Sequence, residues 1–146
     1  MREIKFRGKR ADNGEWVYGD LIHFPATTAI GHPDKDGVCW EEYYVIPETV
    51  GQSIGLKDSK RTEEYPEGQE IYGCIPLENG EMSEGGDIIK YEWEDILWVI
   101  EWHDLAWQKT QACTWQKRYP NRYELNELTS GIEVIGNVHQ NKELLK

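Results

Sequence analysis

Hydrophobic and polar residues alternate along this chain in short runs that turn residues interrupt, which is typical of β-strands. Ile4 and Phe6 alternate with charged residues near the start, and a run rich in apolar residues follows Asn13-Gly14. Asn-Gly tolerates a positive φ at both central positions of a tight turn, and it is therefore a strong hairpin signal. We expect strands near 3–8 and 15–22, joined by this turn.

A second alternating region begins after Gly85-Gly86. It predicts three strands, over 87–93, 96–102 and 106–115, with connections short enough for hairpins. Asn121 and Glu124 then match a capping box, which predicts a short helix over 122–129. A last strand is expected over 132–138, and Asn141 can cap a terminal turn through Leu145.

Between these regions the pattern is weaker. Proline and glycine predict a loop, or an excursion with its own short turn, over 25–42. A short strand over 43–46 ends at Pro47, which can start one helical turn that stops at Gly51. The polar stretch 57–70 reads as an exposed loop. Asn79-Gly80 predicts a hairpin between 71–77 and 81–82, weakened because Pro76 limits pairing to a sheet edge.

The fold class expected from these elements is mainly β with short helices, with an α+β arrangement as the alternative. A length of 146 residues suits one domain, or one domain with a small appended part. We expect an N-terminal β-hairpin part over 1–65 and a C-terminal part over 66–146, with an inserted hairpin near 73–85. Within the second part, 86–138 are expected to form a small SH3-like barrel.

The predicted three-stranded meander is rich in tryptophan. Trp98 and Trp102 share a strand face with Ile96 and Ile100, which we expect to be the core side or an interface. Trp107 shares its face with polar side chains and should be only partly buried. On this basis Trp102→Ala should cost about 3–5 kcal/mol of stability, and Trp107→Ala clearly less.

Charge is spread unevenly over the chain. The net charge is −11, yet residues 34–104 hold nineteen acidic and only five basic side chains, between nearly neutral ends. Such a middle repels phosphate backbones. It is either a solvated face or a surface that attracts a basic partner, and a less favoured hypothesis is that it mimics DNA toward a basic host enzyme.

Catalytic and metal-binding motifs are not evident. The sequence has no nucleophile elbow, phosphate-binding loop or pair of histidines at metal-ligand spacing. We assign no catalytic residue, metal or cofactor, and we expect the protein not to be an enzyme. Cys39, Cys74 and Cys113 are odd in number and far apart, so free buried thiols in a reducing cytoplasm are expected. We expect no signal peptide and no membrane partner, because no sufficiently long apolar run is present.

Two basic groups lie among aromatic side chains. Lys5, Arg7 and Lys9 form a stripe on the first strand, and a second group lies between residues 115 and 123. Such groups can hold nucleic acid, but the stems of Lys and Arg also cover aromatic rings in ordinary packing. The candidate interaction surface consists of Trp107, Trp115, Lys117, Arg118, Tyr119 and Arg122.

Several blocks of residues resemble, in order along the chain, the YopX family of phage and prophage proteins. They are the segments 2–7, 16–19, 47–52, 55–58, 86–91, 99–102, 133–139 and 143–145. This chain differs by a stretch over 73–85 that separates Glu70-Ile71-Tyr72 from Gly86-Asp87-Ile88, and by a longer segment over 26–42. The resemblance implies a cytoplasmic protein of a phage, prophage or mobile element, and it implies no enzymatic activity.

The function expected from these observations is that of an accessory protein without enzymatic activity, acting by binding a host or phage protein. Its many Trp and Tyr side chains could anchor such an interface. The alternative is a nucleic-acid-binding accessory protein that uses the basic first strand or the 115–123 cluster. Whether the chain forms a homo-oligomer is left open.

Overall fold

Strands and tight turns dominate the computed structural model, which describes residues 5–103, 106–115, 122–125 and 131–146. Over these ranges it has eleven strands and three short 3-10 helices. The strands are β1 Phe6–Lys9, β2 Trp16–Phe24, β3 Thr27–Pro33, β4 Trp40–Val45, β5 Gly51–Lys57, β6 Glu70–Cys74, β7 Asp87–Tyr91, β8 Leu97–His103, β9 Ala106–Gln111, β10 Arg122–Glu124 and β11 Ile132–Asn137. The 3-10 helices are η1 Pro47–Thr49, η2 Ala112–Thr114 and η3 Lys142–Leu145.

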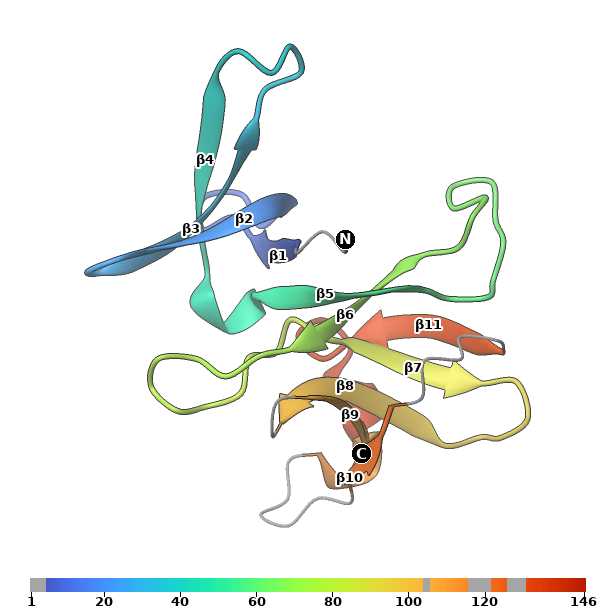
Figure 1. Cartoon of the computed structure of the whole chain (residues 1–146). Helices are drawn as coiled ribbons and strands as arrows, with labels where there is room; N and C mark the ends of the chain where they lie inside the picture. Colours follow the sequence, from blue (N-terminus) through green and yellow to red (C-terminus); the bar gives the residue numbers. More distant parts are fainter. Residues whose placement is uncertain (1–4, 104–105, 116–121, 126–130) are drawn as a thin grey trace.

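The strands pair in the order β10-β9-β8-β6-β5-β1-β2-β3-β4, and β7 joins both β8 and β11. All neighbours are antiparallel except β6 and β8, which run parallel and meet at Cys74 and Glu101. Because β5 pairs with β1 and β6, the pairing is continuous across residue 65. The mainly β prediction is confirmed. The SH3-like barrel is not, because the sheet stays open (Figure 1).

The N-terminal hairpin is confirmed. β1 pairs with β2 from Phe6 opposite Gly19 to Lys9 opposite Trp16. The connecting turn is longer than two residues, since the Arg10 amide donates to the Glu15 carbonyl over 2.8 Å. Gly14 has a φ of 73° in this turn, a conformation that costs glycine little.

Of the two alternatives predicted for 25–42, the plain loop is wrong and the excursion with its own short turn is confirmed, because β3 and β4 pair as a hairpin across the turn between Pro33 and Trp40. The glycine and proline residues in this stretch favour turns, so the sequence pattern did not predict strands here. Gly31 is needed for packing rather than for a turn: a Cβ atom there would lie 2.6 Å from ring atoms of Trp40, which covers it from β4. The resulting β3–β4 hairpin extends away from the C-terminal strands (Figure 1).

The helix predicted over 122–129 is wrong where it can be compared. Arg122–Glu124 form β10, which pairs with β9 from Arg122 opposite Thr110 to Glu124 opposite Gln108. A one-turn capping signal stabilises a short helix weakly, and pairing with a neighbouring strand overrides it. Asn121 and residues 126–130 lie outside the described residues.

The other predicted elements agree more closely. η1 and η3 are the expected helical turns after Pro47 and Asn141. A bridge between Pro76 and Met82 spans the Asn79-Gly80 turn. β7, β8 and β11 match their predicted ranges within a few residues, whereas β9 ends at Gln111 and η2 follows it. β5 was not predicted as a strand.

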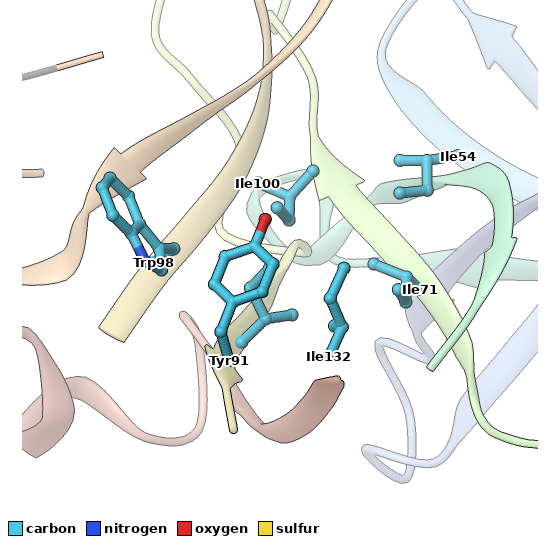
Figure 2. Close-up of a cluster of buried hydrophobic side chains, with 7 residues drawn as sticks. Ile54, Ile71, Tyr91, Trp98, Ile100 and Ile132 are labelled. Atoms are coloured by element: carbon cyan, nitrogen blue, oxygen red, sulfur yellow. The ribbon is translucent and has the colours of Figure 1, made fainter. Parts of the chain in front are cut away.

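Three clusters of buried side chains form the core. The first lies between β5, β6, β7, β8 and β11, where Tyr91 lies among isoleucines and Trp98 at the edge of the cluster (Figure 2). The second lies on the other face of β7 and β8, under η3, and includes Val99 and Val138. The third, with Ile30 and Val45, lies inside the N-terminal strands. Both faces of β8 are therefore buried.

Candidate functional site

The members of the predicted interaction surface that the structure describes, Trp107, Trp115 and Arg122, do not lie together on one surface. Trp102 and Trp107 are directly opposite each other on β8 and β9, with ring centroids 5.1 Å apart. Opposite residues in an antiparallel ladder share a face. Trp107 therefore lies on the same face as Trp98, and it packs against the first core cluster. The expectation that Trp107 is only partly buried is confirmed, but the prediction that it lies on a binding side separate from Trp102 was wrong.

Trp115 lies on the other side of the sheet, where it packs against the second core cluster. Its indole Nε1 donates to Glu101 Oε2 over 3.0 Å, and Arg122 Nε donates to Glu101 Oε1 over 3.0 Å. Trp115 and Arg122 are thus brought together, apart from Trp107. The remaining members of the predicted surface lie outside the described residues: Lys117, Arg118 and Tyr119.

Glu101 is the centre of this second group, and the sequence analysis missed it. Its side chain is buried on β8, and Thr110 Oγ1 also donates to Oε1 over 2.6 Å. His103 Nε2 lies 3.0 Å from Oε1 without the geometry of a hydrogen bond. The available signal was a lone carboxylate within the apolar run of β8. With these donors around it, Glu101 holds β8, β9, η2 and β10 together.

A buried ion pair joins the first strand, β1, to β7. Arg7 on β1 donates from an Nη atom to Asp87 Oδ1 over 2.7 Å, and both side chains are almost completely buried. Arg7 also donates to the Gly85 carbonyl, over 3.1 Å from Nε and 2.8 Å from Nη. The Tyr72 amide donates to Asp87 Oδ2 over 2.7 Å. Burial raises the pKa of Asp87, while Arg7 and the Tyr72 amide oppose that rise.

Aromatic rings enclose the same arginine. The Arg7 guanidinium lies 4.8 Å from the ring of Trp16 and 4.5 Å from that of Tyr72. Lys9 lies over Trp16 as well, and Lys5 lies over Tyr18. The basic stripe of the first strand thus packs on aromatic rings, which is the structural alternative to nucleic-acid contact.

Asp58 is a third buried carboxylate, and its partners are backbone amides. Its Oδ1 accepts from the Gln69 amide over 2.8 Å, and its Oδ2 accepts from the Val134 amide over 3.0 Å. It therefore closes the 58–69 loop onto β11. Asp58, Asp87 and Glu101 belong to the acidic middle but are buried, so these three carboxylates contribute nothing to an acidic outer face.

The cysteines differ in exposure. All three are free thiols, but only Cys74 is buried, so the expectation of three buried thiols was wrong. Burial raises the pKa of the Cys74 thiol, and the thiolate is the reactive form. We expect a thiol reagent to modify Cys39 and Cys113 quickly in the native protein and Cys74 only after unfolding. Equal rates at all three positions would contradict the burial of Cys74.

Within the described ranges, no three His, Cys, Asp or Glu side chains gather as metal ligands would. Nor do these ranges contain a helix with the length and apolar character needed to cross a membrane.

A groove of about 370 Å³ lies where the β2–β3 turn, η1 and the segment after β6 meet. Its walls are mainly apolar, and they comprise Leu21, Phe24, Pro47, Val50, Ile75 and Leu77. Glu48, Glu78 and His23 also line it, whereas no Lys or Arg does. His23 Nδ1 lies 3.5 Å from Glu78 Oε1, and both side chains are exposed. The groove can therefore accept an apolar group with a positive charge beside it.

Sequence reasoning missed this groove because its walls come from distant parts of the chain. Phe24 ends β2, Pro47 begins η1, and Leu77 follows β6. Phe24 is 39% exposed, and its ring lies 6.4 Å from that of Tyr44 in an edge-to-face arrangement. Leu77 belongs to the stretch 73–85 that separates two of the family blocks.

The comparisons with known proteins agree with the resemblance in the sequence. Residues 5–146 match the family described as YopX protein. No curated protein matches the chain significantly. The structure joins two of the family blocks directly, since Arg7 belongs to the first and Asp87 to a later one. With a match over nearly its whole length, the chain belongs to the YopX family.

Proposed function

We propose that this protein is an accessory protein of a phage or prophage that acts, without enzymatic activity of its own, by binding a host or phage protein. The observation that carries the proposal is the groove between the β2–β3 turn, η1 and Leu77. Its volume of about 370 Å³ lies at the lower end of the range of about 300–1,000 Å³ found for small-molecule pockets. Exposed aromatic and apolar walls with a polar rim are typical of an interface core.

The buried ionisable side chains support a binding function rather than a reaction. Arg7, Asp58, Asp87 and Glu101 each hold strands or loops together through hydrogen bonds. Their donors and acceptors are thus engaged within the fold. The groove, in contrast, offers an exposed phenyl ring and carboxylates at the surface, which suit a partner segment with an apolar side chain and a nearby Lys or Arg.

The proposal can be tested by comparing two variants of similar exposure. Phe24 in the groove and Tyr65 in the distant 58–69 loop are 39% and 38% exposed. The immobilised chain should retain a bacterial host protein saturably, and Phe24→Ala should weaken that binding by about tenfold or more. Tyr65→Ala should leave it unchanged. Both variants should keep the urea midpoint of the wild type.

Two results would contradict the proposal: no saturable partner under several conditions, or equal binding by wild type and Phe24→Ala. The nucleic-acid alternative has its own test. Binding of single- or double-stranded DNA or RNA at about 50 mM salt, weakening as salt rises, would favour that alternative. We expect no such binding, because Arg7 is buried and its stripe packs on aromatic rings.

A further inference from the structure

β4 lies at one end of the sheet, and its outer edge is only partly covered. Near Val45 the chain after β1 pairs with it: Arg10 and Val45 form a bridge. On either side, the Ala11 amide donates to the Tyr44 carbonyl and the Ile46 amide donates to the Lys9 carbonyl, each over 2.9 Å. The β1–β2 turn then leaves this edge, and the beginning of β4 extends beyond it.

The backbone geometry shows which groups this free edge presents. Residues two apart in a strand direct their amide and carbonyl groups to the same side. Since the Tyr44 carbonyl points away from β3, the groups of Glu42 and Trp40 also point away from β3. Odd-numbered residues of this segment point the other way, toward β3. The Cys39 carbonyl shows this, because it accepts from the Asp34 amide over 2.7 Å. Among the described residues, no strand pairs with this stretch beyond β3.

A cleft and acidic side chains lie beside the free backbone groups of β4. A surface cleft of about 500 Å³ lies between the Arg10–Asp12 turn and Glu42–Tyr44. Asp12, Glu41 and Glu42 are exposed here. The cation Arg10 is already engaged: its Nη2 lies 2.7 Å from Asp12 Oδ2, and its guanidinium lies 4.4 Å from the ring of Tyr43. The edge is therefore acidic, with its local positive charge occupied.

We propose that the outer edge of β4, from Trp40 to Glu42, accepts an extended segment of a partner protein as an added strand. This segment carries Lys or Arg at alternate positions, on the face of the sheet that Glu42 shares with Trp40 and Tyr44. Backbone hydrogen bonds supply the attachment and side-chain pairing supplies the selectivity, as in other cases of strand addition. The exposed rings of Trp40 and Tyr44 flank the added strand on one face.

Charge complementarity decides between a basic partner and a second copy of this chain. A second β4 paired about a two-fold axis would place glutamates opposite glutamates, and like charges in opposite positions destabilise a strand pair. A basic segment removes that repulsion. This surface is separate from the groove that carries the proposed function, so either can fail without the other.

The test uses a fluorescein-labelled peptide, Lys-Val-Lys-Thr-Lys-Val-Lys, and measures its anisotropy with the full chain. We expect saturable binding, no binding of the same peptide with Glu in place of Lys, and loss of binding when alternate backbone amides are N-methylated. Glu42→Lys should weaken binding by about tenfold or more. Glu63→Lys, the same charge change in the distant 58–69 loop, should have little effect.

A second variant separates the backbone contribution from the charge. The amide of Glu42 points away from β3, so Glu42→Pro should fold, since proline is tolerated on edge strands where the amide faces solvent. It should abolish peptide binding, and the Glu42 amide of the wild type should gain protection from hydrogen exchange when the peptide is added. Leu77→Ala, which changes the wall of the groove formed by the segment after β6, should bind the peptide normally, which separates this surface from the groove.

Three outcomes would overturn the inference. Equal binding of the N-methylated peptide would reduce the effect to charge attraction. No binding of the lysine peptide would mean that the glutamates only keep the edge free, as charged residues on edge strands often do. Self-association of the chain that Glu42→Pro abolishes would identify a second copy as the occupant.

Discussion

Arg7→Ala is expected to lower the free energy of unfolding by about 3–5 kcal/mol, the cost typical of removing one partner from a buried ion pair. Asp87 would keep its charge in a site that is 1% exposed, and the Gly85 carbonyl would lose its donors. The space between the rings of Trp16 and Tyr72 would also be left empty. Urea denaturation at constant slope measures the change.

Lys9→Ala is the matched control for this variant. Lys9 lies on the same strand and over the same Trp16 ring, but it is only half-buried. We expect a loss below about 1 kcal/mol, as for most surface contacts. Because burial raises the pKa of Asp87, the native Arg7→Ala protein should bind a proton there more readily than its unfolded chain. In the wild type Arg7 opposes this rise, so acidification should stabilise the variant more than the wild type and thereby reduce the deficit.

A deficit for Arg7→Ala as small as that of Lys9→Ala would show that the pair is not essential to the fold. If Arg7→Ala does not fold, Asp87→Asn provides a second measurement. It removes the negative charge but keeps an acceptor for the Tyr72 amide, and it should destabilise the protein by at least about 2 kcal/mol through the unpaired guanidinium.

Trp107→Ala is expected to lower stability by about 3 kcal/mol, at least as much as Trp102→Ala. This reverses the order expected from the alternation of residues. Trp107 packs against the first core cluster, and its ring lies directly on the backbone of Gly73, where an added Cβ would lie 2.3 Å from a ring atom. Trp102 contacts Trp107 edge to face. The two variants can be compared by their urea midpoints.

A clearly larger loss for Trp102→Ala would contradict the packing of Trp107 on Gly73. The double variant provides a further check. Because the two rings touch, their effects should not be additive, whereas distant sites usually add within about 0.5 kcal/mol.

The elements with local signals could be predicted from the order of residues alone. Asn13-Gly14 predicted the first hairpin, Pro47 predicted η1, and alternation predicted β7, β8, β9 and β11. Each depends on a few adjacent residues whose backbone preferences agree with the fold. The same is true of the family, since its blocks are short and ordered along the chain, and the match covers 5–146.

The tertiary structure alone decided the features that depend on register and on distant contacts. A strand has two faces, and alternation within it cannot tell which residues of a neighbouring strand share its buried face. Strand pairing places Trp107 opposite Trp102. Arg122 lies in a strand, where its side chain donates to Glu101, and not in a helix. The paired strands form an open sheet. The groove and the free edge of β4 arise in the same way, because Phe24 meets Leu77 and the β1–β2 turn ends beside Tyr44 only once the chain has folded.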